Sequence, residues 1–378
     1  MRDCVENMRF LFVVGTRPEA IKLAPLILEI AHHSHVTTIC SGQHRSLAQE
    51  PLKWFGIEPD DEIIFRSELR TLATLTGALL APMERMIQKH KPDIIVAQGD
   101  TTTALVTALT SFYLRIPFAH VEAGLRTGDF HAPFPEEFNR VVASRVAHWH
   151  FCPTKRAVAN LHAEGIASSG VFLVGNTGID SLRLTLDRID IAASCHRRRI
   201  LLTAHRRENQ GHRMEDICRA VREIVHEFKD VEFVVPVHPA PTVRCTYEQL
   251  LRGHDRINLL PPLQYQCFVS EMAQCHLILT DSGGIQEEAP YLKKPVLVLR
   301  DVTDRPETID LGVAQLVGTE PARVVGAVRE LLVNPTTYSK MASGGSPYGD
   351  GYAARRIASK LGVVKGAARG IREKLEHC

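Results

Sequence analysis

The chain has 378 residues and a nearly balanced charge, with 45 Lys and Arg against 43 Asp and Glu and a formal net charge of +2. This length suggests two domains, and a hydrophobic fraction of 44% is enough for a packed core and argues against disorder. The near-neutral balance gives no support to nucleic-acid binding as a main function.

The first half of the chain alternates short apolar runs with longer amphipathic stretches. Runs of this length are typical of buried parallel strands, and the stretches between them are typical of helices. In chain order we predict strands at 10–14, 36–40, 94–97 and 117–121, and helices at 18–32, 71–90 and 102–114.

The second half repeats this alternation, with strands predicted at 200–203, 233–236, 277–279 and 296–299, and helices at 215–229 and 320–333. Such alternation predicts parallel sheets with helices on both faces. We therefore predict an α/β protein of two Rossmann-like, doubly wound domains. They would span residues 8–174 and 175–361, with the junction just after a strand at 171–174.

Polar motifs follow most of the predicted strands. In doubly wound folds the functional loops lie at the carboxyl ends of the strands. We therefore expect the loops of the two domains to face one another across a cleft. These loops begin at Gly15, Gln98, Glu122, Ala204, Asp281 and Arg300.

The segment TDSGGIQEE, which begins at Thr280, is the most informative of these loops. Its two glycines allow a tight turn and a close approach of the backbone to a ligand. A helix predicted to begin there, capped by Asp281 or Ser282, would present free N–H groups to an anion. Glu288, about a turn further on, can hold a ribose diol. The segment predicts a nucleotide-diphosphate site; the alternative is a sharp turn with ordinary surface acids.

The first predicted strand is followed by Gly15-Thr16-Arg17-Pro18, not by Gly-x-Gly-x-x-Gly. No dinucleotide fingerprint occurs elsewhere in the required context, so NAD-dependent chemistry is not expected. Arg17 and Lys22 lie near the start of the next predicted helix. Because a cation there opposes the helix dipole, we favour an anion-binding role over surface charge.

Three carboxylates, Asp100, Glu122 and Glu136, lie near strand ends or in the adjacent loop, and His205 follows a strand of the second half. General acid–base catalysis needs several titratable groups in different environments, so this set suggests proton transfer. The alternatives are helix capping by Asp100 or Glu136 and a hydrogen-bonded structural role for His205.

Two further residues leave two alternatives open. Arg305 follows another strand-end loop, where it can neutralise phosphate or fix the loop through an ion pair. Phe268 can flank a nucleobase or fill the core between helix and sheet, and composition alone favours the core.

The nine cysteines are scattered without Cys-x-x-Cys spacing, which is typical of a reduced, cytoplasmic protein. The eighteen histidines form no recognised metal-binding pattern. No apolar run approaches the roughly 20 residues needed to cross a bilayer, and the first residues have no signal-peptide pattern. We therefore expect a cytoplasmic protein with no metal, no cofactor, no membrane contact and no nucleic-acid partner.

Seven segments, in family order over almost the whole chain, resemble the non-hydrolysing UDP-N-acetylglucosamine 2-epimerases. They are GTRPEAIK at 15–22, GDTTT at 99–103, HVEAGLRTGD at 120–129, PEE at 135–137, HRREN at 205–209, TDSGGIQEEAP at 280–290 and PYGDG at 347–351. The resemblance implies a glycosyltransferase-B architecture, a C-terminal helix at about 362–378 that returns to the first domain, and a homodimer. It also implies reversible conversion of UDP-GlcNAc to UDP-ManNAc, by elimination of UDP to a 2-acetamidoglucal and re-addition.

The resemblance also implies roles for individual residues. Asp100, Glu122, Glu136 and His205 match the family's catalytic set, with Asp100 and Glu122 as candidates for proton transfer at C2. The positions that match the UDP-sugar site are Arg17, Lys22, Asp100, Glu122, His205, Phe268, Ser282, Gly283, Gly284, Glu288 and Arg305.

A second, regulatory UDP-GlcNAc site is implied by the resemblance at Gln43, His44, Arg206 and His238. Residues 46–48, which come shortly after His44, depart from the family pattern, and so does Ala240. We therefore expect weakened activation by UDP-GlcNAc. Three other functions remain as alternatives: a glycosyltransferase on the same architecture, a hydrolysing epimerase that releases UDP and free ManNAc, and a non-catalytic nucleotide-sugar sensor. The set of acids disfavours the first and the last of these.

Overall fold

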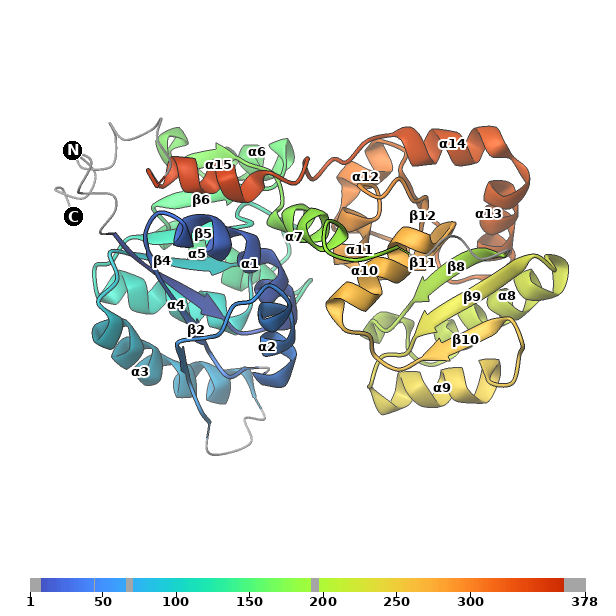
Figure 1. Cartoon of the computed structure of the whole chain (residues 1–378), viewed down its shortest axis with the longest axis horizontal. Coiled ribbons are helices and arrows are strands. Elements are labelled where there is room, and N and C mark those ends of the chain that lie inside the picture. Colours follow the sequence, from blue (N-terminus) through green and yellow to red (C-terminus); the bar gives the residue numbers. More distant parts are fainter. Residues whose placement is uncertain (1–7, 44, 66–70, 192–196, 364–378) are drawn as a thin grey trace. The chain divides into compact units, whose positions relative to one another are not determined.

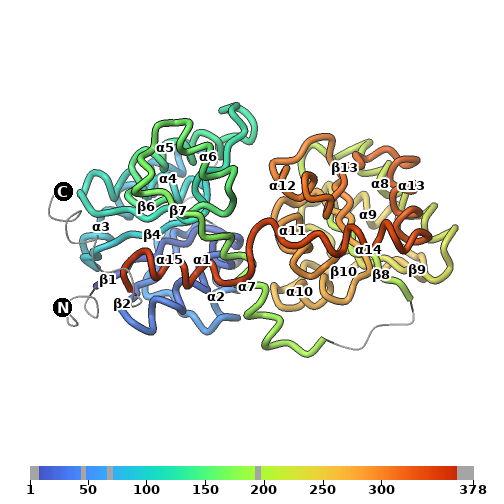
Figure 2. The backbone as a smooth tube through the Cα atoms, turned by 90° about the horizontal axis from the view of Figure 1, so that it is seen from above, coloured from blue at the N-terminus to red at the C-terminus, as the bar shows by residue number. Residues whose placement is uncertain are grey.

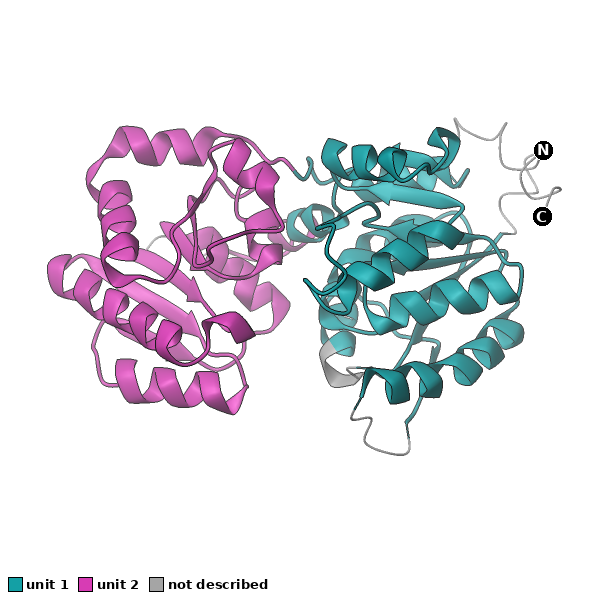
Figure 3. Cartoon of the chain, turned by 180° about the vertical axis from the view of Figure 1, so that it is seen from behind, with its two compact units in different colours: residues 1–183, 348–378 teal, residues 184–347 magenta. Residues whose placement is uncertain are grey.

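The computed structural model describes residues 8–43, 45–65, 71–191 and 197–363. The chain divides into two compact units, coloured separately in Figure 3. The first unit comprises the described residues up to Arg183 and those from Tyr348 onward, and the second comprises the described residues of Leu184–Pro347. The prediction for His44 falls outside the described residues, as does all but the first two residues of the C-terminal helix predicted at about 362–378.

The first unit is built on a parallel sheet in the order β3-β2-β1-β4-β5-β6-β7 (Figure 1). Its strands are β1 (Arg9–Val14), β2 (His35–Cys40), β3 (Asp61–Glu62), β4 (Ile94–Gln98), β5 (Phe118–Val121), β6 (Trp149–Cys152) and β7 (Val171–Leu173). Its helices are α1 (Arg17–Ala31), α2 (Arg45–Trp54), α3 (Leu72–His90), α4 (Thr102–Tyr113), α5 (Glu136–Val146), α6 (Lys155–Ala163), α7 (Thr177–Leu186) and α15 (Ala353–Lys360).

Both faces of this sheet are covered. Leu11 and Val13 of β1 pack in one core cluster with residues of α3 and α4. Phe10 and Phe12 are equally buried, and they lie on the other face because successive side chains of a strand alternate. This two-sided burial explains why β1 is an unbroken apolar run in the sequence.

The second unit is built on a parallel sheet in the order β10-β9-β8-β11-β12-β13. Its strands are β8 (Arg198–Thr203), β9 (Val231–Pro236), β10 (Ile257–Leu260), β11 (Leu277–Thr280), β12 (Val296–Val298) and β13 (Ala314–Leu316). Its helices are α8 (His212–Glu227), α9 (Pro241–Leu251), α10 (Tyr265–Gln274), α11 (Gly283–Glu288), α12 (Pro306–Asp310), α13 (Pro321–Val333) and α14 (Pro335–Ser343).

The predicted α/β class with two doubly wound sheets is confirmed, and within the described residues each strand and helix predicted from the apolar and amphipathic runs coincides with an observed one within a few residues. Four strands were not predicted: β3, β6, β10 and β13. Three of these lie at sheet edges, and β6 and β10 carry polar residues such as His150 and Asn258 between apolar ones. Short edge strands face solvent on one side, so they lack the continuous apolar run that reveals a central strand.

The last described helix, α15, belongs to the first unit, where it lies beside α1 (Figure 2). Asp180 of α7 fixes its start, because the carboxylate accepts hydrogen bonds from the N–H groups of Ala353 and Ala354 at 3.1 and 2.8 Å. The chain passes to the second unit within α7, after Arg183, and returns to the first unit at Tyr348. The predicted domain boundary between residues 174 and 175 stays a prediction. No helix among the described residues is long and apolar enough to cross a membrane.

Candidate active site

Glu122 lies directly after β5 and is held by two side chains of the first unit. Its Oε2 accepts hydrogen bonds from Lys22 Nζ at 2.5 Å and from Gln98 Nε2 at 2.8 Å. The Glu122 side chain is 8% exposed and its φ is +63°, an uncommon conformation for a residue other than glycine. Lys22 therefore meets a carboxylate in this structure, and the pair brings a predicted anion-binding residue and a predicted catalytic residue together.

Asp100, directly after β4 and Gly99, forms an ion pair with Arg140 of α5 at 2.8 Å. Asn139 Nδ2 donates to the Asp100 carbonyl oxygen at 2.8 Å, so α5 fixes this loop through both backbone and side chain. The capping alternative for Asp100 is not what the structure shows, because the N-cap of α4 is Thr101, whose hydroxyl accepts from Ala104 N.

His120, fully buried on β5, supports the turn at Gly99. Burial lowers the pKa of His120 to about 3, so its ring is neutral. Its Nε2 lies 2.7 Å from the Gly99 carbonyl oxygen, which can only accept, and the proton therefore resides on Nε2. Gly99 has a φ of +76°, which explains the glycine directly before Asp100.

Glu19 is a buried acid that the sequence reasoning did not single out. Its carboxylate accepts hydrogen bonds from the N–H groups of Gly15 and Thr16 at 2.6 and 2.7 Å, and from the Thr101 hydroxyl. Burial raises the pKa of Glu19 to about 7 despite these donors. Glu19 thus joins the loop after β1 to the loop that carries Asp100. The only sequence signal for it is the capping-box spacing from Thr16.

Glu136 is the first residue of α5 and is half-buried. The N-cap of this helix is Pro135, and no side chain caps it, so the capping alternative for Glu136 is not seen. Among the described residues no hydrogen bond or ion pair engages the Glu136 carboxylate. Its neighbour Glu137 is the structural acid: it is buried and accepts from the backbone N–H groups of Thr127 and Gly128 at 3.0–3.1 Å.

Arg17, at the first position of α1, lies 3.5 Å from Glu50 of α2. Both side chains are more than a quarter exposed, so this ion pair is weak.

In the second unit, His205 follows β8 and lies against Asp281, which follows β11. Asp281 is fully buried, and its Oδ2 accepts from the N–H groups of His205 and Arg206 at 2.9 and 2.8 Å and from Asn209 Nδ2 at 3.0 Å. The ring of His238 stacks on that of His205, with 4.8 Å between centroids and 9° between planes. The N-cap of α11 is Ser282, so Asp281 anchors the neighbouring loop and does not cap the helix.

Arg305 is buried between two acids. Its Nε donates to Glu287 at 2.5 Å and its Nη1 lies 2.9 Å from Asp304. Burial alone would raise the pKa of Asp304, but the charges of Arg305, Arg206 and Arg300 outweigh it and hold this pKa well below its usual range. The ion-pair alternative for Arg305 is therefore present in the structure.

The start of α11 lies beside two guanidinium groups. A Cβ atom at Gly283 would be 3.6 Å from Arg305 Cζ and 3.7 Å from Arg206 Nη2. The next glycine, Gly284, has only Ser282 Oγ at 4.0 Å, so its Cα faces open space. Arg206, predicted at a regulatory site, is thus close to the predicted diphosphate site of the same unit.

The other predicted residues lie in the same two units. Glu288 ends α11 and Phe268 lies on α10; both are half-buried, and Phe268 is outside the apolar core cluster of the second unit. Gln43 Oε1 accepts from the Thr103 hydroxyl at 2.8 Å, next to the loops of the first unit. Among the described residues no group of three or more His, Cys, Asp or Glu could hold a metal ion, and the absence of a metal stays a prediction.

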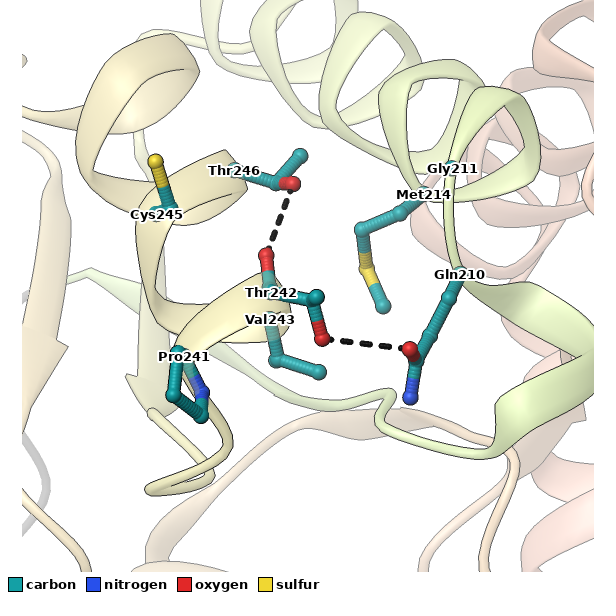
Figure 4. A pocket seen from close by; sticks show the side chains of 8 residues that line it. All are labelled: Gln210, Gly211, Met214, Pro241, Thr242, Val243, Cys245 and Thr246. Carbon is teal, nitrogen blue, oxygen red and sulfur yellow. Dashed lines mark hydrogen bonds between the residues drawn. The ribbon is translucent and has the colours of Figure 1, made fainter.

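A hollow of about 490 Å³ lies between the starts of α8 and α9 (Figure 4). Thr242 Oγ1 donates to Gln210 Oε1 at 3.1 Å across it, and Met214 and Val243 contribute apolar surface. None of the predicted site residues lines this hollow, so it lies apart from the candidate active site.

Comparisons with known proteins agree over nearly the whole chain. The family model described as UDP-N-acetylglucosamine 2-epimerase matches residues 28–362. The UDP-N-acetylglucosamine 2-epimerase of Bacillus subtilis is 43% identical over 368 residues, which covers 94% of this chain and 96% of the relative. That of Escherichia coli K12 is 42% identical over 369 residues, 94% of this chain and 98% of the relative.

Solved structures give the same result. The UDP-GlcNAc 2-epimerase of Neisseria meningitidis bound to UDP-GlcNAc has a TM-score of 0.89 and 39% identity, with 94% of this chain and 99% of that one covered. The UDP-GlcNAc 2-epimerase of Methanocaldococcus jannaschii, in complex with UDP-GlcNAc and UDP, has a TM-score of 0.80 and 32% identity, with 94% of this chain and 100% of that one covered.

Proposed function

The chain belongs to the UDP-N-acetylglucosamine 2-epimerase family and is an isomerase, and we propose that it interconverts UDP-GlcNAc and UDP-ManNAc. The observation that carries the proposal is the pairing of acids and cations at the carboxyl ends of the strands. Glu122 and Asp100 follow neighbouring strands of the first sheet, and Arg206 and Arg305 flank the turn after β11 in the second. UDP-GlcNAc or UDP is bound in the related structures from Neisseria meningitidis and Methanocaldococcus jannaschii.

The proposed reaction is elimination of UDP to give a 2-acetamidoglucal, followed by re-addition with the opposite configuration at C2. The hydrogen at C2 has no adjacent carbonyl, so its direct removal would be difficult. Departure of the diphosphate builds positive charge at C1 and makes the C2 proton more acidic. Groups that stabilise the developing diphosphate charge are therefore central to the rate. Retention of both fragments in the site makes re-addition effectively intramolecular.

We assign the removal and return of the C2 proton to two acids of the first unit. Asp100 and Glu122 would remove and return the C2 proton on the two faces of the sugar, with Glu136 and His205 assisting proton transfer or the departure of UDP. The environments of the acids support different roles, because Asp100 is paired with Arg140, Glu122 with Lys22, and Glu136 with no described group.

We assign UDP binding mainly to the second unit. The Ser282 hydroxyl and the N–H groups of Gly283 and Gly284, together with the guanidinium group of Arg305, would receive the diphosphate. Glu288 would hold the ribose and Phe268 the base, while Arg17 and Lys22 of the first unit would add positive charge. No cofactor or metal is required by this mechanism. A homodimer, a cytoplasmic location, a cleft between the units and weakened regulation through Gln43, Arg206 and His238 stay predictions.

Product analysis tests the proposal. Purified enzyme incubated with UDP-GlcNAc should give UDP-ManNAc and no free ManNAc, and the C2 proton should exchange with deuterium oxide without any acceptor. Release of UDP with free ManNAc would instead support a hydrolysing epimerase. Consumption of UDP-GlcNAc only when an acceptor is present, without exchange at C2, would indicate a glycosyltransferase, and binding with neither exchange nor turnover would indicate a sensor.

A further inference from the structure

One buried carboxylate oxygen in the second unit has no hydrogen-bond donor. Asp281 is fully buried, and all three donors described above reach its Oδ2. Among the described residues none reaches Oδ1. A buried carboxylate oxygen normally receives a hydrogen bond, because leaving it without one forfeits its hydration. We therefore expect a donor to form a hydrogen bond with Asp281 Oδ1 in the working enzyme.

The nearest candidate donor is the ring of His205. Its Nδ1 lies 3.8 Å from Asp281 Oδ1, beyond hydrogen-bond distance but within reach of a small ring movement. The backbone N–H of His205 is already bonded to the other oxygen of the same carboxylate, so the two residues cannot separate. Catalytic hydrogen bonds are often long in the absence of substrate and tighten when it binds.

The surroundings of the His205 ring restrict how it can move. His238, from the loop after β9, stacks on one face of the ring. Burial and the neighbouring charge of His205 lower the pKa of His238, which favours a neutral stacking partner. A small displacement of the ring would bring Nδ1 within hydrogen-bond distance of Asp281 Oδ1 and leave Nε2 as the nitrogen that can meet a substrate. The side chain of His205 is 38% exposed, so Nε2 has access to a ligand.

We propose that Asp281 is a positioning residue that receives the Nδ1 proton of His205 and thereby fixes Nε2 as the nitrogen that exchanges a proton with the substrate. The inference rests on the proposed function, in which His205 assists proton transfer. Asp281 immediately precedes Ser282, so one carboxylate also ties the imidazole to the loop that would receive the diphosphate. A base oriented by a third group is a recurring arrangement in enzymes.

Asp281→Asn separates the orientation of the His205 ring from the anchoring of the loop by hydrogen bonds to Oδ2. The amide oxygen of Asn can accept the three hydrogen bonds now made to Oδ2, while its NH₂ group would face His205 Nδ1. A donor in that position favours the tautomer with the proton on Nε2. Asp180→Asn is the matched control, because Asp180 is also a buried carboxylate that accepts two backbone N–H groups, and no histidine among the described residues forms a hydrogen bond or ion pair with it.

Two measurements test the proposal. Long-range proton–nitrogen NMR of enzyme labelled with ¹⁵N-histidine, with His205→Ala to identify the signal, should show the neutral His205 ring protonated on Nδ1 in the wild type and on Nε2 in Asp281→Asn. Steady-state kinetics should show kcat reduced by about 10²-fold or more in Asp281→Asn with KM within about threefold, and little change in Asp180→Asn.

A wild-type His205 protonated on Nε2 would overturn the proposal, as would Asp281→Asn with kcat within about threefold of wild type. If Asp281→Asn does not fold, the tautomer in the wild type decides alone. Failure of the proposed function is recognised separately: wild-type enzyme would then show no epimerisation, or His205→Ala would retain full turnover, and the NMR result would still decide the role of Asp281.

Discussion

The two units treat a buried carboxyl group in opposite ways. Glu19, in the first turn of α1, and Asp304, in the loop between β12 and α12, are both largely buried. Glu19 receives hydrogen bonds from neutral donors only, and burial raises its pKa to about 7. Three arginines surround Asp304, and their charges lower its pKa although burial opposes them. A buried carboxyl group with neutral donors can therefore hold a proton near neutral pH, whereas neighbouring positive charge keeps a buried carboxyl group ionised.

The largest expected effect tests whether proton transfer at C2 depends on acids of the first unit. Asp100→Asn and Glu122→Gln should each lower turnover by about 10²-fold or more, because each removes a positioned acid or base. Their affinity for UDP, measured by calorimetry, should stay within about threefold of wild type. Glu84→Gln, at an exposed position of α3, is the control and should leave both quantities unchanged. Equal losses of turnover and UDP affinity would contradict the assignment of proton transfer at C2 and UDP binding to different units.

The pH dependence of stability tests the opposite pKa values directly. For Glu19 the pKa is higher in the folded state, at about 7, than the unfolded value of 4.5. Its contribution to stability is therefore fully present below about pH 4.5 and is lost as the pH rises through about 7, a change of roughly 3 kcal/mol. Glu19→Gln should remove this loss, as measured by denaturant unfolding at both ends of that range.

For Asp304 the sign is reversed. Its folded-state pKa lies below the unfolded value of 3.8, so its contribution is present above that pH and is lost on acidification. Asp304→Asn should therefore lose less stability in acid than the wild type does. Near neutral pH this substitution should not alter the pH dependence of stability. The contrast fails if Glu19→Gln and Asp304→Asn change the pH dependence in the same direction.

Adjacent glycines test whether anion binding belongs to the second unit. Gly283→Ala would place a methyl group beside the guanidinium groups of Arg305 and Arg206, and we expect UDP affinity to fall by about 10-fold. Gly284→Ala meets only Ser282 Oγ at 4.0 Å and should have the smaller effect. Neither glycine has a positive φ, so both variants should fold with unchanged or slightly increased stability. A larger loss in Gly284→Ala would place the diphosphate on the other side of the turn.

The smallest expected effect concerns the base. Phe268→Ala should weaken UDP binding by about fivefold, the lower end of what stacking on an aromatic side chain contributes. Phe112→Ala, at an exposed aromatic residue of the first unit, should leave UDP binding unchanged. An unchanged affinity in Phe268→Ala, measured by the same calorimetry, would show that the base is held elsewhere.

The sequence predicted the positions of the site loops well, because central strands are continuous apolar runs and functional loops follow their carboxyl ends. It did not predict Glu19, Arg140 or the contact of Asp281 with His205. Arg140 lies 40 residues beyond Asp100, in a helix whose face toward the site only the fold determines. Asp281 was expected as one of two helix caps, and local sequence cannot show that its side chain turns toward a different strand-end loop.

The first unit is built from two separate parts of the chain, and this affects the order in which the two units become complete during synthesis. Its last described helix, α15, comes after the whole second unit in the sequence, yet it packs on α1 and is fixed by Asp180. A ribosome therefore completes residues 184–347 while the first unit still lacks a helix that covers its core. Domains usually mature from the N-terminus onward during synthesis. In this protein the unit that begins first is the last to receive all of its parts.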